Sequence, residues 1–391
     1  MLHFSKNNYS KFTLIIAFLT TTGKLRYMSK KKKHTSALHE VDGVSPPAST
    51  NETSIKKIKL TRNRLPSTVE FVKHILKGNR TYLSRAITLI ESTNSKHKQK
   101  ASEIVTACLP HVNNSIRIGI TGVPGVGKST FIEAFGKVLT ALGKKVAVLA
   151  IDPSSSINHG SILGDKTRMS ELVKNENAFI RPSPSGKSLG GVAQKTRETI
   201  ILCEAAGFDT IIIETVGVGQ SEIAVHSMVD FFLLLKLAGA GDELQGIKRG
   251  IIEMADAIVI NKADGSNTKQ AEFAKAEFSR ALHLYPLKKS TWQPKVTTCS
   301  AIEDTGIDTV WKIIETYIEL TKSTSYFEEQ RNEQNKFWVL ETINEQLKNN
   351  FYNHSEIKKI LPKVLQQVQT HKLSSFEAAK KVLAVYTKLP K

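Results

Sequence analysis

The chain has 391 residues, of which 40% are hydrophobic, so it has room for one large domain with additions or for two domains. Its formal net charge is +19, and the first 64 residues contribute much of that excess, with thirteen Lys and Arg against three Asp and Glu. Its three cysteines, Cys108, Cys203 and Cys299, are far apart. This spacing argues against a disulfide framework and against a structural zinc site, and it fits a reducing compartment.

Residues 1–64 are predicted to form a disordered basic leader. The apolar run Phe12–Leu19 is too short to cross a bilayer, and Met28 is a natural start for a soluble protein. We therefore expect residues 1–27 to be either an upstream start artefact or a targeting leader. A basic tail can bind nucleic acid, but no aromatic residues alternate with Lys30–Lys33. We expect no nucleic-acid or membrane partner, and a location in the cytoplasm, or in the mitochondrial matrix if residues 1–27 are a transit leader.

Residues 65–112 are predicted to be an N-terminal helical segment, in which Ser67 or Thr68 can cap the first helix. Residues 323–391 are predicted to be a C-terminal helical extension, in which Pro362 marks a kink or a first turn. The apolar residues of that extension recur at helical spacing and need a partner, either the same chain or a second copy. One such stripe consists of Phe337, Leu340, Ile343 and Leu347.

Residues 113–322 alternate apolar strands with helical stretches, which predicts an α/β fold with a mostly parallel sheet flanked by helices. The predicted strands are Ile116–Ile120, Val146–Ile151, Thr210–Ile213, Phe231–Leu235, Ala257–Ile260 and Val296–Cys299. Ligands of such sheets bind at the carboxyl ends of the strands, and the polar motifs of this chain follow those ends.

Residues 122–129 read Gly-Val-Pro-Gly-Val-Gly-Lys-Ser, a G-x-x-x-x-G-K-[ST] phosphate loop between a strand and a helix predicted over Thr130–Leu142. In such a loop Lys128 bridges the β- and γ-phosphates, and Ser129 ligates Mg²⁺. The bound species is therefore a nucleoside triphosphate with Mg²⁺. The nucleotide-binding residues predicted here are Gly122, Val123, Pro124, Gly125, Val126, Gly127, Lys128, Ser129 and Thr130.

Two carboxylates at strand ends are candidates for the magnesium shell. Asp152 ends one strand, where it can reach Mg²⁺ or a water bound to it, or can simply cap a turn. Glu214 ends another strand, in Glu-Thr-Val-Gly, where ordinary GTPases have Asp-x-x-Gly. Gln220 and Glu222 are candidates for positioning water, although Gln220 fits a merely solvated loop equally well.

Asn261-Lys262-Ala263-Asp264 follows the strand Ala257–Ile260 and matches the N-K-x-D guanine reader. Asp264 can accept hydrogen bonds from two neighbouring guanine donors, whereas adenine offers no such pair and leaves the carboxylate unpaired. This difference predicts GTP rather than ATP. Backbone N–H groups at Ser300, Ala301 and Ile302 are predicted to complete the base pocket.

Two further loops have the composition of nucleotide-dependent switches. In 160–168, Asp165 can orient water or metal, and Lys166 or Arg168 can neutralise transition-state charge, although the three also fit an ordinary ion-paired loop. Residues 238–248 are Gly-rich and charged although they follow a buried strand. That combination suits a mobile loop that reports the nucleotide state to a partner.

Together these segments resemble the MeaB/ArgK GTPases, the family that includes the methylmalonic aciduria type A protein. The resemblance covers about residues 65–391. The segments that carry it are Gly-Val-Pro-Gly-Val-Gly-Lys-Ser-Thr (122–130), Asp-Pro-Ser-Ser (152–155), Gly-Ser-Ile-Leu-Gly-Asp-Lys-Thr-Arg-Met (160–169), Glu-Thr-Val-Gly-Val-Gly-Gln-Ser-Glu (214–222), Gly-Ala-Gly-Asp-Glu-Leu-Gln-Gly-Ile-Lys (239–248) and Asn-Lys-Ala-Asp (261–264).

The resemblance implies a P-loop GTPase of the SIMIBI class that gates adenosylcobalamin loading of methylmalonyl-CoA mutase and protects or reactivates that enzyme. It implies a homodimer formed in part through residues 323–391, and it transfers catalytic roles to Lys128, Asp165 and Glu214. It also implies a partner-coupling switch at Gln245 and Lys248. The residues that it implies for the metal are Ser129, Asp152, Asp165 and Glu214.

Three other functions remain as alternatives. A small-molecule or transport-system kinase could use the same phosphate loop, but N-K-x-D argues against its ATP preference. A metal-delivery GTPase needs a His-rich tract, whereas the eleven His residues here are scattered. A non-enzymatic nucleic-acid binder would depend on the basic tail.

Overall fold

The computed structural model describes residues 65–112, 115–152, 169–184, 189–215, 221–239 and 249–388. The chain divides into two compact units, 1–64 and 65–391, and all of the described residues belong to the second. The sequence-based boundaries at 112/113 and 322/323 lie within that second unit and remain predictions.

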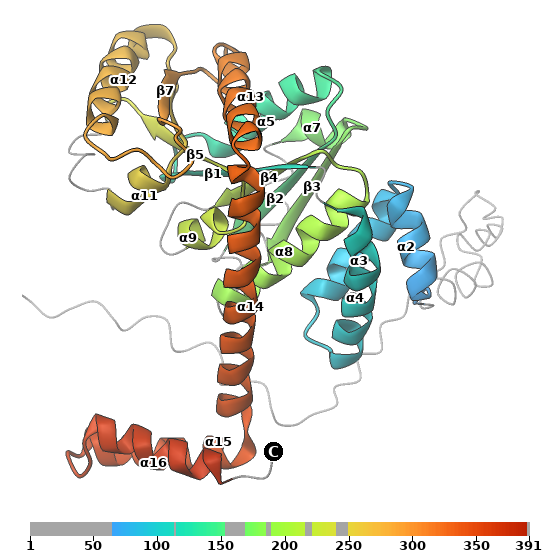
Figure 1. The fold of residues 1–391 in the computed structure, drawn as a ribbon, viewed down its shortest axis with the longest axis vertical. Helices are drawn as coiled ribbons and strands as arrows, with labels where there is room; N and C mark the ends of the chain where they lie inside the picture. The colour runs from blue at the N-terminus through green and yellow to red at the C-terminus, as the bar shows by residue number, and fades with distance from the viewer. Residues whose placement is uncertain are drawn as a thin grey trace, which may run out of the picture. The chain divides into compact units, whose positions relative to one another are not determined.

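A seven-stranded parallel sheet with the order β3-β2-β4-β1-β5-β6-β7 forms the centre of the second unit (Figure 1). Its strands are β1 Ile116–Gly122, β2 Val146–Asp152, β3 Ala178–Pro184, β4 Thr210–Thr215, β5 Phe231–Leu237, β6 Ala257–Asn261 and β7 Lys295–Thr298. The predicted α/β class and the six predicted strands are confirmed. The composition of Arg181-Pro-Ser-Pro and Gly190-Gly191 also predicts a loop rich in Gly, Ser and Pro. This prediction is wrong, because Arg181–Pro184 form the end of β3 and Gly190-Gly191 lie in the helix Leu189–Ala205.

Helices cover both faces of the sheet. Successive strand residues point to opposite sides, and the apolar side chains on both sides are buried against helices. In β4, Ile212 packs into a core with helices α5 (Lys128–Ala141) and α13 (Ile307–Ser323). Its neighbours Ile211 and Ile213 pack into a second core on the other face. The remaining helices between strands are α7 Ser170–Lys174, α8 Leu189–Ala205, α9 Ser221–His226, α11 Arg249–Met254 and α12 Thr268–Leu282, with short 3-10 turns at Leu109–His111 and Gly265–Asn267.

The predicted N-terminal helices are α2 (Thr68–Leu76), α3 (Arg80–Glu91) and α4 (Ser95–Cys108), which pack on one another and on α8. Ser67 caps α2, since its hydroxyl accepts a hydrogen bond from the backbone N–H of Glu70 at 3.2 Å. The C-terminal end of α3 is fixed to β3 by an ion pair between Arg181 and Glu91.

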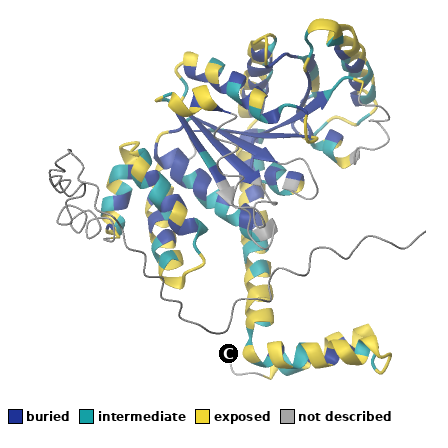
Figure 2. Ribbon diagram, turned by 180° about the vertical axis from the view of Figure 1, so that it is seen from behind, coloured by how far each residue is buried: buried dark blue, intermediate teal, exposed yellow. Residues whose placement is uncertain are grey.

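The predicted C-terminal helices are α14 (Tyr326–Asn353), α15 (Ser355–Gln369) and α16 (Ser375–Thr387). Pro362 lies well inside α15 rather than in its first turn. The first half of α14 packs on α8, whereas its second half is mostly exposed, as the burial colouring shows (Figure 2). Helices α15 and α16 form a small core of their own around Ile357, Val364, Ala378 and Val382.

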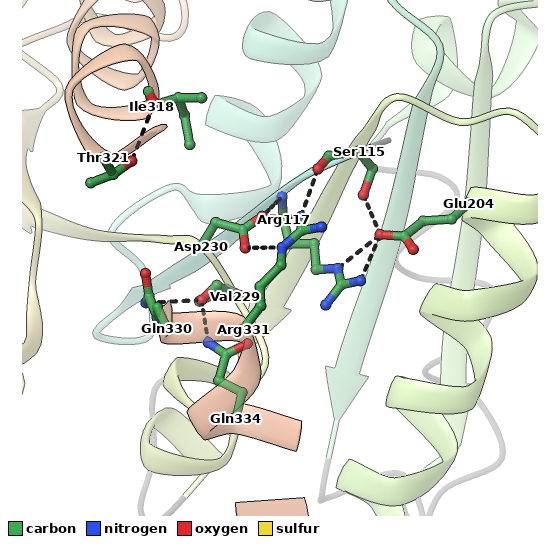
Figure 3. Close-up of polar contacts among 10 residues, drawn as sticks. All are labelled: Ser115, Arg117, Glu204, Val229, Asp230, Ile318, Thr321, Gln330, Arg331 and Gln334. Carbon is green, nitrogen blue, oxygen red and sulfur yellow. Dashed lines mark hydrogen bonds and ion pairs between the residues drawn. The ribbon is translucent and has the colours of Figure 1, made fainter. Parts of the chain in front are cut away.

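A buried ion network joins α14 to the amino-terminal edge of the sheet (Figure 3). The Arg331 guanidinium donates to both carboxylate oxygens of Asp230, at 2.8 and 2.7 Å, and to the carbonyl oxygen of Ser115 at 2.7 Å. Asp230 also accepts from the backbone N–H of Arg117 in β1, and Arg117 pairs with Glu204 of α8 at 2.8 Å. One network therefore connects α14, α8 and the starts of β1 and β5.

Candidate nucleotide-binding site

The predicted phosphate loop connects β1, which lies between β4 and β5, to the first residue of α5. Gly125 and Gly127 have φ of 83° and 92°, a left-handed backbone that disfavours other residues. A Cβ at Gly127 would also lie 2.9 Å from Nδ2 of Asn261. The loop thus needs glycine for its conformation and for its contact with the segment after β6, and it ends at a helix N-terminus, where anions bind.

Lys128 is the first residue of α5, and 9% of it is exposed. Its ammonium donates to the carbonyl oxygens of Gly122 at 2.8 Å and Val123 at 3.2 Å. Burial lowers the pKa of Lys128, and the charges of Glu214 and Glu222 oppose that change. The cation is therefore held at the loop by two backbone oxygens, and two neighbouring carboxylates favour its charged form.

Ser129 and Glu214 meet at the carboxyl edge of the sheet. The Ser129 hydroxyl donates to Oε1 of Glu214 at 3.3 Å, and 8% of Glu214 is exposed. Glu214 lies in β4, and Ser129 follows β1 through the phosphate loop. A hydrogen bond of 2.8 Å between the Thr215 and Thr121 hydroxyls joins these two strands. Hydroxyl and carboxylate oxygens are the ligands that Mg²⁺ prefers, so this pair fits the predicted metal shell.

The rest of the predicted metal shell is only partly described. The backbone of Asp152 ends β2, beside Glu214's strand, but its side chain lies outside the described residues. Asp165 lies outside them too. Within the described ranges, no three His, Cys, Asp or Glu side chains gather as a metal-ligand cluster.

The segment after β6 contacts the phosphate loop directly. Asn261, the last residue of β6, donates from Nδ2 to the carbonyl oxygen of Val126 at 2.8 Å. The Lys262 ammonium donates to the carbonyl oxygen of Gly125 at 3.0 Å, and Lys262 itself has a φ of 60°. The structure therefore brings two motifs that are far apart in the sequence to one place.

The segment after β7 holds the side chains of the predicted guanine reader. The Ser300 hydroxyl donates to Oδ2 of Asp264 at 2.6 Å, and the Cys299 thiol donates to Oδ1 of Asn261 at 3.4 Å. The backbone N–H of Ser300 donates to the carbonyl oxygen of Thr305 at 3.0 Å. Its predicted role at the base remains a prediction. The contact made by Cys299 was not predictable, because no sequence motif marks a single buried cysteine.

Ala301 and Ile302 follow directly in this segment. Of these, Ala301 is buried, and 76% of Ile302 is exposed. The predicted role of their N–H groups at a base remains a prediction. Glu222, predicted from the sequence near the nucleotide, lies in α9 and is buried. The other switch candidates, Lys166, Arg168, Gln220, Gln245 and Lys248, lie outside the described residues.

No helix in the part of the chain that the structure describes has the length and apolar character needed to cross a membrane. A parallel sheet with this phosphate loop after β1 and an Asn-Lys-Ala-Asp segment after β6 defines a P-loop GTPase.

Comparison with known proteins specifies the family. The family model described as "Methylmalonyl Co-A mutase-associated GTPase MeaB" matches residues 83–356. The GTPase ArgK of Escherichia coli is 45% identical over 305 residues, which are 78% of this chain and 92% of ArgK. The mouse protein named methylmalonic aciduria type A homolog, mitochondrial, is 44% identical over 80% of this chain and 78% of its own. The chain belongs to the MeaB family of GTPases.

The crystal structure of a protein named LAO/AO transport system kinase is similar in its fold. It matches with a TM-score of 0.68 and 36% identity, over 83% of this chain and 100% of that one. The resemblance noted from the sequence motifs is thus confirmed, and so is the P-loop GTPase fold.

Proposed function

We propose that this GTPase is a chaperone of adenosylcobalamin-dependent methylmalonyl-CoA mutase, and that it gates the loading of the cofactor and helps to reactivate the enzyme. The observation that carries the proposal is the family match over residues 83–356, because the family description names association with this mutase. The name of the mouse relative, which refers to methylmalonic aciduria, points in the same direction.

In the proposed mechanism GTP binds across the phosphate loop and the Asn261–Asp264 segment. The Lys128 ammonium, held at the loop by the Gly122 and Val123 carbonyls, neutralises charge on the β- and γ-phosphates. Asp264, held by the Ser300 hydroxyl, accepts from the two guanine donors. Ser129, Asp152, Asp165 and Glu214 are the residues that would hold Mg²⁺, which supplies charge neutralisation at the phosphates.

Coupling to the mutase is assigned to the loop 240–248, with Gln245 and Lys248 as the contact residues. This loop joins the end of β5, beside the phosphate-loop strand, to α11. The strand that leads into this segment thus lies next to the strand that leads into the phosphate loop, which supports a nucleotide-dependent switch there.

Dimerisation is assigned to the C-terminal helices. Leu340, Ile343 and Leu347 lie at i, i+3 and i+7 on α14 and are 62%, 50% and 58% exposed. An apolar stripe on the free half of a long helix is a surface that a second copy can cover. We place the protein in the cytoplasm, or in the mitochondrial matrix if residues 1–27 are a transit leader.

The chaperone function is tested by adding the purified mutase to the full chain and measuring both GTP hydrolysis and complex formation. We expect slow intrinsic hydrolysis that rises with the mutase, and no hydrolysis in Lys128→Ala with or without it. Unchanged hydrolysis together with no complex would refute the proposal.

A transport-system kinase is the second candidate, because the structural relative carries that name. Such a kinase would use ATP, whereas the Asn-Lys-Ala-Asp segment that ends in Asp264 favours a guanine reader. Competition of labelled GTP by equal concentrations of ATP separates the two: a kinase predicts displacement, and the GTPase predicts none.

A further inference from the structure

The orientation of the Asn261 amide decides whether this side chain can donate a hydrogen bond to the phosphate loop. Its Nδ2 donates to the carbonyl oxygen of Val126 at 2.8 Å, and only 1% of Asn261 is exposed. The two ends of an amide have nearly the same shape, so packing alone does not select between them. If the amide were reversed, Oδ1 would face the Val126 carbonyl oxygen, and two acceptors would oppose each other in a buried place.

Cys299 supplies a donor at the other end of the amide, which adds to the preference for the observed orientation. It directly follows β7, is 2% exposed, and donates from Sγ to Oδ1 of Asn261 at 3.4 Å. Burial raises the pKa of the Cys299 thiol to about 12, and the charge of Asp264 adds to this. The sulfur therefore keeps its proton at neutral pH and remains a donor.

The backbone of Cys299 is fixed on both sides of the same turn. Its N–H donates to the carbonyl oxygen of Ile260 at 2.9 Å, and its carbonyl oxygen accepts from the N–H of Ala263 at 3.0 Å. The next residue, Ser300, donates to Asp264 at 2.6 Å. Cys299 and Ser300 thus hold two of the three polar side chains of the guanine reader, Asn261 and Asp264, one each.

We propose that Cys299 is a positioning residue for nucleotide binding, whose thiol fixes the amide of Asn261 so that Nδ2 holds the phosphate loop at Val126. The cysteine acts through Asn261 and is not expected to touch the nucleotide. This role of Cys299 affects nucleotide affinity and does not depend on which protein is the partner.

The test compares Cys299→Thr with Cys299→Val, because these side chains have nearly the same shape and differ by a hydroxyl donor. Affinity for a fluorescent GTP analogue, KM and kcat for GTP, and the melting temperature without nucleotide are measured. We expect Thr to bind within about twofold of the parent, and Val to bind about three- to tenfold more weakly, the value of one ordinary hydrogen bond. For Val, KM should rise while kcat at saturating GTP is unchanged.

Cys203→Val is the matched control, because Cys203 is a fully buried thiol in the core on the other face of the sheet. It should leave GTP affinity unchanged. Since Thr and Val are both larger than Cys, the smaller pair Cys299→Ser and Cys299→Ala repeats the comparison without added volume. Equal GTP affinity within both pairs, or an equal loss in Cys203→Val, would overturn the proposal.

Discussion

Removing the Arg331 side chain should destabilise the protein by several kcal/mol. Arg331→Ala deletes two hydrogen bonds to Asp230, one to the carbonyl oxygen of Ser115, and the packing of the guanidinium over the Phe327 ring, 4.4 Å from its centroid. Asp230 is 1% exposed, so its charge would stay buried with the backbone N–H of Arg117 as a remaining donor.

The magnitude follows from that uncompensated charge. Breaking one side of a buried ion pair costs about 3–5 kcal/mol. At roughly 2 °C per kcal/mol for a domain of this size, the melting temperature should fall by about 6–10 °C. The assay is thermal unfolding of parent and variant at one protein concentration and without nucleotide.

Two further variants make this prediction specific. Lys336→Ala removes an ion pair with Glu333 on the same helix, but both side chains are largely exposed, so its melting temperature should match the parent's. The double variant Arg331→Met with Asp230→Asn removes both charges and should recover much of the loss. A shift below 2 °C in Arg331→Ala, or a double variant no more stable than the single one, would refute this reasoning.

The remaining predictions concern the nucleotide and the second copy. Lys128→Ala should abolish GTP turnover, measured as phosphate release, because it removes the ammonium expected to neutralise charge on the β- and γ-phosphates. Asp264→Asn should weaken GTP binding by a few kcal/mol, measured by titration, because two hydrogen bonds to a charged acceptor are lost. Ile343→Glu with Leu347→Glu should shift the protein from dimer to monomer in analytical ultracentrifugation, since the charges fall on the exposed stripe of α14.

Each of these has a contradicting result. Normal turnover in Lys128→Ala would show that the phosphate loop is not the site of GTP hydrolysis. Unchanged GTP affinity in Asp264→Asn would remove Asp264 from base recognition. An intact dimer in the double glutamate variant would move the interface away from α14, and Leu142→Glu, at an equally exposed leucine after α5, controls for added surface charge.

The sheet was predictable because its strands are apolar runs, yet β3 was missed for a physical reason. It contains Pro182 and Pro184, which lack a backbone donor and read as a loop. Proline is tolerated in edge strands, and β3 is the edge of this sheet. Only the sheet order, which places β3 outside β2, reveals that this run can be a strand.

The site was predictable where a local motif encodes it and not where it depends on contacts between distant segments. Lys128, Ser129 and Asp264 are recognisable from spacing alone. The pairing of Cys299 with Asn261 joins residues 38 apart, and that of Arg331 with Asp230 joins residues 101 apart. Such contacts depend on how strands and helices pack, which no local pattern specifies.

The most direct test of the central claim is the rate at which adenosylcobalamin enters the cofactor-free mutase, followed by the absorbance of the cofactor. In the presence of this protein we expect loading to be withheld with a non-hydrolysable GTP analogue and to proceed with GTP, while Lys128→Ala exerts no control. Equal loading rates with GTP, with the analogue and without the protein would contradict the proposed gating function.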